Sequence, residues 1–390
     1  MKKIYFDNAA TTRVKDKVVE SMLPYFTEIY GNPSSVHGIG RDAKRALDTQ
    51  RAAIAEMLGA KPREIFFTAS GSEADNWAIK GVAGANAKKG KHIITSSIEH
   101  HAVLHTCKFL EGRGYEVTYL PVDSYGKVSV KDLEDAIRKD TILITIMHAN
   151  NEIGTIQPIA EIGEIAKSKK IPFHTDAVQT VGTIPVNVND LNVDMLSLSG
   201  HKIHAPKGIG VLYARSGRVG DNLLHGGAQE SNKRAGTENI PYIVGLSTAM
   251  QMALENMELN TTRTKAMRDD IISFVMKNID YVRLNGHPVD RLPGNVNISF
   301  EFVEGESLLL MLDMKGICAS SGSACTSGSL DPSHVLLATG LTHEIAHGSV
   351  RFSLSDENTN EEVKYLKEVL PGILKTLRNI SPLYNERKVR

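Results

Sequence analysis

The sequence DMLSLSGHK occupies residues 194–202 and leads from an apolar run directly to a lysine. The run Asp194–Leu198 has the length of a buried strand, and the small or polar residues Ser199, Gly200 and His201 place Lys202 just beyond the strand end. Six further runs of similar length are predicted strands: Glu64–Thr68, His92–Ser96, Glu116–Leu120, Ile142–Met147, Ile171–Thr175 and Gly208–Tyr213. Most lack clean apolar–polar alternation, which indicates a sheet covered on both faces.

Helical patterns lie between these runs. In Arg41–Leu58 the apolar residues fall on one face, and Ser129 has the type and position of a helix N-cap. Strands that alternate with helices predict an α/β fold, with a large domain built on a mostly parallel seven-stranded sheet sandwiched by helices.

The pattern changes from about Asn239 onward and predicts a smaller α+β domain. Its expected elements are a long helical stretch to about Asn278, a strand over Val296–Phe302, a helix over Glu306–Met314, a strand over Ser349–Ser355 and a helix over Thr359–Leu377. We therefore predict an N-terminal segment over residues 1–14 that packs against either domain, a large domain over 15–255 and a small domain over 256–390.

Composition excludes several classes of protein. The 390 residues carry 45 Lys and Arg against 45 Asp and Glu, so the basic excess of a nucleic-acid or membrane-surface binder is absent. No apolar run reaches the roughly 18 residues of a membrane span. Asp7 and Asn8 interrupt the start before an apolar signal-peptide core forms, which predicts a cytoplasmic protein. Three cysteines exclude a disulfide framework, and no metal site is predicted.

Lys202 is the first candidate for chemistry. Alone, a lysine at a strand end is ordinarily a solvated surface residue. A partly desolvated lysine loses its proton more easily and can form a Schiff base, which is how pyridoxal 5′-phosphate (PLP) is held. PLP also requires a carboxylate for its ring nitrogen, and Asp176 follows the strand Ile171–Thr175, although an Asp there could instead cap a helix.

Further strand ends offer groups that suit PLP. The loop Thr68–Glu73 opens a helix, where backbone N–H groups bind phosphate, and Ser70 with Glu73 also has the spacing of a capping box. His100 or His101 could stack on the ring, and sequence spacing does not separate the two. The segment Asn150–Gly154 could donate to the phenolic oxygen. No single motif is specific, but five strand ends with PLP-compatible groups form a strong joint pattern.

Cys325 and Arg351 suggest the substrate. Cys325 lies in a Ser/Gly-rich stretch without large side chains, which predicts a mobile loop that displays a thiol. Cys107 and Cys318 have apolar neighbours and are predicted to be buried. Arg351 lies in an alternating strand, where an arginine is usually at the surface, but an enzyme that acts on amino acids needs a guanidinium for the carboxylate.

Taken together, these residues resemble the cysteine desulfurases of the NifS/IscS class, which belong to the class-V aminotransferase family of fold-type I PLP enzymes. The resemblance covers nearly the whole chain. Its motifs are Asp7–Thr12, Gly31–Ser35, Glu99–Val103, Asn150–Gly154, His174–Gln179, Ser199–Lys202, Arg234–Asn239 and Ser321–Cys325.

The resemblance implies a role for each matching residue. Lys202 forms the Schiff base, Asp176 pairs with the pyridinium nitrogen, and His100 stacks on the ring and moves protons. The remaining cofactor contacts are Gln179 and Asn151 at the phenolic oxygen, and Gly71, Ser72, Ser199 and His201 at the phosphate. Arg351, Asn8, Asn32 and Asn151 bind the substrate cysteine, and Cys325 is the nucleophile. Thr237 reaches the phosphate of a neighbouring subunit, which implies a homodimer.

The implied activity converts L-cysteine to L-alanine and leaves a persulfide on Cys325. The expected sulfur acceptor is an IscU/NifU-like iron–sulfur scaffold or another sulfur acceptor, in either a nitrogenase-type or a housekeeping role. Three alternatives remain open at this point: another PLP enzyme such as an aminotransferase or selenocysteine lyase, a non-catalytic sulfur carrier, and a hydrolase that pairs Cys325 with His343.

Overall fold

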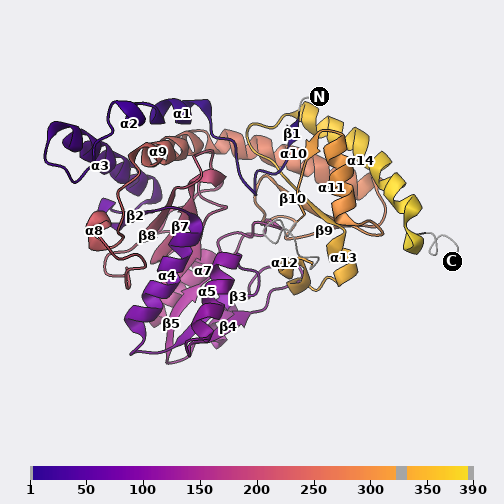
Figure 1. The fold of residues 1–390 in the computed structure, drawn as a ribbon. Helices are drawn as coiled ribbons and strands as arrows, with labels where there is room; N and C mark the ends of the chain where they lie inside the picture. The colour runs from indigo at the N-terminus through magenta and orange to yellow at the C-terminus, as the bar shows by residue number, and fades with distance from the viewer. Residues whose placement is uncertain (1–2, 322–331, 385–390) are drawn as a thin grey trace.

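A computed structural model describes residues 3–321 and 332–384 (Figure 1). Its largest sheet has seven strands in the order β2-β8-β7-β6-β5-β3-β4. These strands are β2 (Ile65–Thr68), β3 (His92–Ser96), β4 (Glu116–Leu120), β5 (Thr141–Thr145), β6 (Phe173–Asp176), β7 (Met195–Ser199) and β8 (Gly210–Ala214). Only β8 runs antiparallel to its neighbours, so the predicted mostly parallel sheet is confirmed.

Both faces of this sheet are covered, because adjacent strand residues belong to different cores. Phe66 and Met195 pack with α4 and α5, whereas Phe67 and Leu196 pack with α3 and α9 on the opposite face. The helices around the sheet are α1 (Asp16–Met22), α2 (Pro24–Thr27), α3 (Gly38–Leu58), α4 (Gly71–Asn86), α5 (His101–Glu111), α6 (Val130–Asp135), α7 (Ile159–Lys169), α8 (Gln229–Asn232) and α9 (Ile240–Glu255). This double covering explains why the strands lack alternation in sequence.

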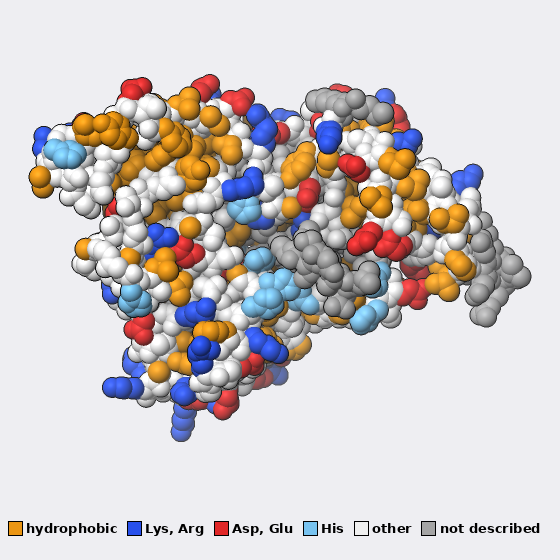
Figure 2. Space-filling model, in the orientation of Figure 1, with side chains coloured by type: hydrophobic (Ala, Val, Ile, Leu, Met, Phe, Trp, Pro, Cys, Tyr) orange, Lys and Arg blue, Asp and Glu red, His pale blue; other side chains and the backbone are white. Residues whose placement is uncertain are grey.

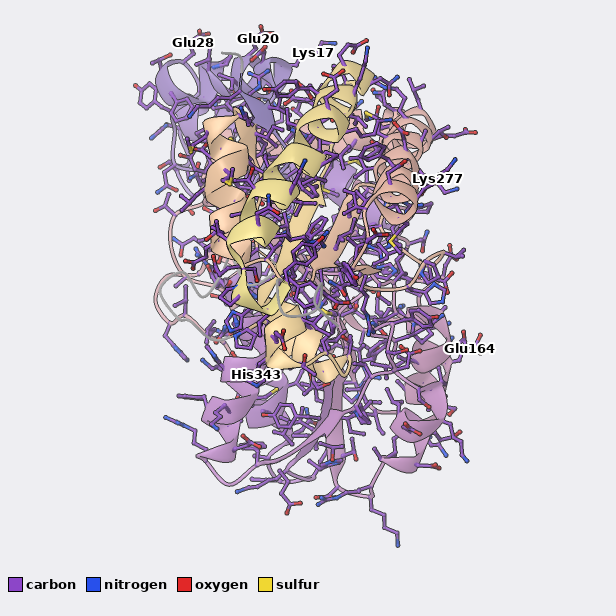
Figure 3. The ribbon with its side chains drawn as sticks, turned by 90° about the vertical axis from the view of Figure 1, so that its right-hand side faces the viewer. Lys17, Glu20, Glu28, Glu164, Lys277 and His343 are labelled. Carbon is purple, nitrogen blue, oxygen red and sulfur yellow. The ribbon has the colours of Figure 1, made fainter. Side chains whose placement is uncertain are left out.

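A second core surrounds a three-stranded antiparallel sheet in the order β12-β10-β9. Figure 3 views this smaller unit from the side on which α14 lies in front of the sheet. Its elements are α10 (Met257–Asn278), β9 (Val282–Leu284), β10 (Asn295–Phe300), α11 (Gly305–Met314), β11 (Ile317–Cys318), α12 (His334–Ala338), α13 (His343–His347), β12 (Ser349–Ser353) and α14 (Asn360–Ile380).

The sequence-based bounds differ from the structure in a few places. The long helical stretch before Asn278 is two helices, because Asn256 has a non-helical backbone between α9 and α10. Cys107 is buried as predicted, but Cys318 is partly exposed. The domain division at residue 255 stays a prediction; it coincides with the break before α10.

The N-terminal segment packs against both units. Strand β1 (Ile4–Tyr5) pairs with β11 of the small unit, and Phe6 is buried in that core. The chain then crosses to the large sheet, where the Thr12 N–H donates to the His201 carbonyl at 2.9 Å. In the described part of the chain, no helix has both the length and the apolar character of a membrane span.

Candidate active site

A cavity of about 320 Å³ opens where the parallel strands of the large sheet end. Most of the residues predicted to bind a cofactor or substrate line it: Gly71, Ser72, His100, Asn151, Asp176, Gln179, Ser199, His201, Lys202 and Arg351. They come from segments that follow β2, β3, β5, β6 and β7, together with β12 of the small unit. The sheet topology therefore brings together groups that are far apart in sequence.

Lys202 ends a single 3₁₀ turn, Gly200–Lys202, that directly follows β7. Its Nζ donates to the Ala9 carbonyl at 2.5 Å and to the Ala10 carbonyl at 2.8 Å. The turn needs glycine at position 200, where a Cβ would lie 2.8 Å from the Ile209 side chain. The N-terminal segment thus holds the amine in the cavity wall, a contact that sequence spacing alone did not reveal.

Two buried carboxyl groups lie opposite this lysine. Asp176 ends β6, and burial raises its pKa to about 6 even though the Val178 N–H donates to its Oδ1 at 2.9 Å. Asp75, on α4, is also buried; desolvation, followed by the nearby Asp176 charge, raises its pKa well above the usual range. Sequence analysis missed Asp75, although its position three residues after Ser72 on the same helix was a usable signal.

Asp75, Asp176 and His100 form a compact polar group, and their potential ligand atoms all lie within 4.8 Å of one another. Such a group could contact a metal ion. The neighbouring lysine and helix N-terminus are features that a metal site does not require, whereas a phosphorylated aldehyde cofactor requires both.

The N-terminus of α4 forms a backbone cradle. The Ser70 side chain accepts the Glu73 N–H at 3.1 Å, so the predicted cap is confirmed, and Gly71 and Ser72 follow in the first turn. A Cβ at Gly71 would lie 2.7 Å from Val178 Cγ2 and 3.3 Å from Ser199 Cβ. Only glycine leaves room here for close approach of a ligand to the backbone.

His100 caps α5 and faces the cavity, which His101 does not line. Desolvation, with added repulsion from Lys202, lowers the pKa of His100 to about 4, so the ring is neutral near pH 7. His101 instead packs against His105 and His334, with ring centroids 5.0 and 4.9 Å away. Figure 2 shows histidine side chains gathered at the middle of this face.

Arg351 lies on β12 with only 2% of its side chain exposed. Its guanidinium donates to the Asn151 carbonyl at 2.9 Å and to Asp7 Oδ1 at 3.1 Å. Its buried Nε has no hydrogen-bond partner among the residues that the structure describes. Arg351 is therefore a cavity residue and not the surface arginine that strands usually carry. Asp7 is a second partner that sequence analysis did not single out.

The remaining predicted residues lie outside this cavity. Asn8 lines a neighbouring cavity, Asn32 accepts the Ser34 N–H at 2.9 Å in a local turn, and Thr237 is exposed. Cys325 lies outside the described residues. The chain on either side of residues 322–331 contacts the site, because Ser320 pairs with Arg351 and the His334 ring lies 3.0 Å from the Glu99 carbonyl.

The residues present fit PLP. The cradle at Gly71 suits a phosphate, and a buried carboxyl and a neutral histidine adjoin the same space as Lys202. The orphaned Nε of Arg351 leaves a donor for a carboxylate.

Comparisons with known proteins agree with this chemistry. The sequence model of the aminotransferase class-V family matches residues 4–366. "Cysteine desulfurase IscS" of Methanosarcina thermophila is 60% identical over 382 residues, which cover 98% of this chain and 94% of that protein. A solved structure described as a NifS-like protein has a TM-score of 0.89 at 41% identity and covers 97% of this chain and 99% of its own. A structure described as SspA in complex with cysteine has a TM-score of 0.81, also at 41% identity, over 91% of this chain and 100% of its own.

The family match, the names of the relatives and the structural likeness confirm the predicted family and the predicted fold-type I architecture. The chain belongs to the class-V aminotransferase family and, within it, to the cysteine desulfurases of the NifS/IscS class.

Proposed function

We propose that this chain is a PLP-dependent cysteine desulfurase that transfers the sulfur of L-cysteine to Cys325 and releases L-alanine. The observation that carries the proposal is the shared cavity of Lys202, Asp176 and Arg351. A Schiff-base amine, a carboxylate for a ring nitrogen and a guanidinium for a substrate carboxylate are the three groups that this chemistry needs.

PLP, when bound, supplies an electron sink that makes the substrate Cα proton acidic. The chain's own groups hold it: Gly71, Ser72, Ser199 and His201 are proposed for the phosphate, Asp176 for the ring nitrogen, and Asn151 and Gln179 for the phenolic oxygen. His100 covers the ring face. The Lys202 amine would be the base for the Cα proton, and the Ala9 and Ala10 carbonyls hold it in the cavity wall.

Substrate binding requires an exchange of anions at Arg351. Asp7 now accepts from the guanidinium, and burial raises the pKa of this carboxyl despite the opposing Arg351 charge. A substrate carboxylate has two oxygens and can accept from two N–H groups of Arg351 at once. Nε is available for this, because it has no hydrogen-bond partner among the described residues. Asn8, Asn32 and Asn151 are proposed to border the bound cysteine.

Sulfur transfer balances without an external oxidant or reductant. The Cys325 thiolate attacks the substrate sulfur, an S–S bond forms as the Cβ–S bond breaks, and Cβ takes up a proton to give alanine. We propose Cys325 because the relatives are desulfurases and because both described flanks of its segment contact the site.

A homodimer, a sulfur acceptor and a cellular compartment are proposed as well. Thr237 is exposed on the single chain and is proposed to reach the phosphate of a second copy in a homodimer. Arg234, three residues earlier, binds Glu73 at 2.8 Å and so ties this loop to the phosphate cradle.

An IscU/NifU-like scaffold or another thiol-bearing protein is the proposed acceptor. The cytoplasm is the proposed compartment, since persulfide transfer needs reduced thiols.

The test adds L-cysteine to the purified, PLP-loaded protein and measures alanine together with protein-bound persulfide. We expect equal amounts of both in the first turnover. Lys202→Ala should abolish both products, and Cys325→Ser should abolish the persulfide, whereas Cys318→Ser, a matched control on a partly exposed thiol, should retain both. Unchanged sulfide release from Cys325→Ser would show that sulfur does not pass through this residue.

A further inference from the structure

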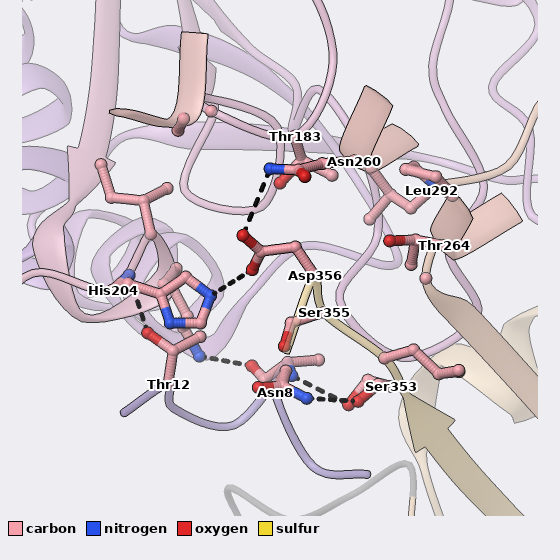
Figure 4. Close-up of a pocket in the computed structure, with 18 of the residues that line it drawn as sticks. Asn8, Thr12, Thr183, His204, Asn260, Thr264, Leu292, Ser353, Ser355 and Asp356 are labelled. Carbon is pink, nitrogen blue, oxygen red and sulfur yellow. Dashed lines mark hydrogen bonds and ion pairs between the residues drawn. The ribbon is translucent and has the colours of Figure 1, made fainter. Parts of the chain in front are cut away.

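Figure 4 shows the residues that line a second cavity, of about 120 Å³. Ala9, Gln179 and Lys202 line both cavities, so the N-terminal segment and the Lys202 turn form the wall between them. The far side of the second cavity belongs to α10 and to the segment after β12. This cavity therefore lies between the lysine-bearing turn and the strand that carries Arg351.

Asp356 joins three separate segments across this cavity. Its carboxylate accepts from Lys15 at the start of α1, from Asn260 Nδ2 on α10 at 3.2 Å, and faces His204 Nε2 at 3.3 Å. The side chains of Lys15, His204 and Asp356 are each no more than 20% exposed. Burial alone would raise the Asp356 pKa, but contacts with His204 and Lys15 lower it well below the usual range, so the group is a carboxylate.

His204 is held in a strained conformation two residues after Lys202. Its φ is +64°, a left-handed value that is costly for a residue other than glycine. The His204 N–H donates to Thr12 Oγ1 at 2.8 Å, and its Nδ1 lies 2.9 Å from the Arg13 carbonyl. Both ring nitrogens of His204 face oxygen atoms, so the ring bridges the Arg13 carbonyl and the Asp356 carboxylate.

The contact between His204 and Asp356 lies close in sequence to Lys202 and to Arg351. His204 directly continues the turn that places Lys202, while Asp356 follows Arg351 by five residues, after the end of β12. The distance between the Lys202 amine and the Arg351 guanidinium decides whether a substrate held by its carboxylate presents Cα to the base. A misplacement of about 1 Å at such a point can cost about 100-fold in rate.

We propose that Asp356 is a positioning residue that, through His204 and Lys15, fixes the Lys202 turn relative to the strand bearing Arg351. The inference rests on the proposed roles of Lys202 and Arg351. Asp356 is not among the described residues that line the cavity of Lys202 and Arg351, so it acts through the segments that it joins. Its loss leaves the reacting groups present but misplaced.

The test uses Asp356→Asn, which keeps the shape but removes the charge, and His204→Asn, which tolerates the left-handed backbone but cannot reach Asp356. The matched control is Asp290→Asn, because Asp290 pairs with Lys127 at 2.8 Å in another contact between the two units, away from both cavities. Measured quantities are kcat and KM for L-cysteine, the rate at which cofactor-free protein develops visible absorbance with added PLP, and Tm.

We expect both variants to lower kcat and to slow PLP uptake about ten-fold, with Asp290→Asn within about two-fold of wild type. The double variant should be little worse than Asp356→Asn alone, since Asp356→Asn already weakens the contact with His204. Asp356→Glu, which keeps the charge, should retain more of kcat than Asp356→Asn. If Asp356→Asn does not fold, His204→Asn tests the same contact.

A fall in Tm with unchanged kcat and unchanged PLP uptake would overturn the proposal, because it would show a purely structural role. Equal effects of Asp290→Asn on kcat and PLP uptake would overturn it as well, because the loss of any contact between the units would then have the same result. Absence of alanine production by the wild-type protein would instead count against the proposed function, and the PLP-uptake rates would still decide the role of Asp356.

Discussion

Glu99 immediately precedes His100 and is completely buried. Its Oε1 accepts from Ser96 Oγ and from the Met147 N–H, whereas its Oε2 has no hydrogen-bond partner in the described part of the chain. Desolvation raises the pKa of Glu99 to about 8 despite these two donors, and the nearby Asp176 charge raises it further. The residue beside His100, the histidine proposed to stack on the cofactor ring, is thus a neutral acid at the lower end of the physiological pH range.

This shift predicts a pH-dependent effect of Glu99→Gln. The folded pKa lies above the unfolded value of about 4.3, so the folded state binds the extra proton between these values and wild-type stability falls as pH rises towards 8. The glutamine variant has no such proton. Its Tm relative to wild type should therefore increase from pH 5 to pH 8, as measured by thermal denaturation.

Glu64→Gln is the control for that comparison. Glu64 is also buried, but hydrogen bonds from Ser216 and Lys61 outweigh desolvation and lower its pKa. Its titration lies below pH 5, so the Tm difference from wild type should stay constant between pH 5 and 8. A constant difference for Glu99→Gln as well would contradict the raised pKa.

At the residue scale, sequence predicted groups whose chemistry is tied to one strand end, such as Lys202 and Asp176. It missed Asp7 and the Ala9 and Ala10 carbonyls, because their partners are contributed by distant segments. It also missed Asp75, although the position of Asp75 on the same helix as Ser72 was a local signal. Burial of an arginine such as Arg351 is likewise a property of the assembled fold and has no local sequence signal.

At the scale of elements, the first turn of α4 determines whether a phosphate can reach the backbone. We expect Gly71→Ala to weaken PLP binding by at least about ten-fold, because the added methyl group would contact Val178 and Ser199 and displace the cradle. The measurement is a titration of cofactor-free protein with PLP, followed by visible absorbance.

Gly372→Ala provides the matched control. Gly372 lies in the exposed middle of α14, and a Cβ there would meet nothing within 4 Å. This change should leave PLP affinity unchanged and stabilise the protein by about 0.5–1 kcal/mol through helix propensity. Similar PLP affinity in both glycine variants would refute the steric explanation.

Element type was predictable wherever periodicity was strong, as in α3 and α14, and the capping residues Ser70 and Ser129 marked true helix starts. The break at Asn256 was not predicted, because no glycine or proline marks it. Tertiary packing explains it: α9 packs against α1 and α3, whereas α10 packs against β9, β10 and α14.

At the scale of the whole molecule, alternation of strands and helices predicted the layered architecture but not the strand order, which depends on pairings between distant runs. The proposed homodimer would likewise bring together residues that are distant, in this case on two subunits. Each complete site would need Lys202 from one chain and Thr237 from the other.

Mixed dimers test this arrangement. Lys202→Ala and Thr237→Ala homodimers should each be impaired at limiting PLP, the first completely. Random 1:1 exchange of their subunits should create wild-type sites in about a quarter of the positions, since half of the dimers are mixed and each has one complete site. The measurement is alanine production before and after exchange; activity that only reflects dilution of the Thr237→Ala protein would contradict a shared site.

The pairing of β1 with β11 also has a consequence for biosynthesis. The ribosome makes Ile4 and Tyr5 long before it makes their partners Ile317 and Cys318. At about 5–20 residues per second, this strand waits many seconds before it can dock. The backbone carbonyls of Ala9 and Ala10 follow it directly, so the wall around the Lys202 amine is completed late. Nascent chains should consequently acquire the proposed coenzyme only after Ile317 and Cys318 have emerged from the ribosome.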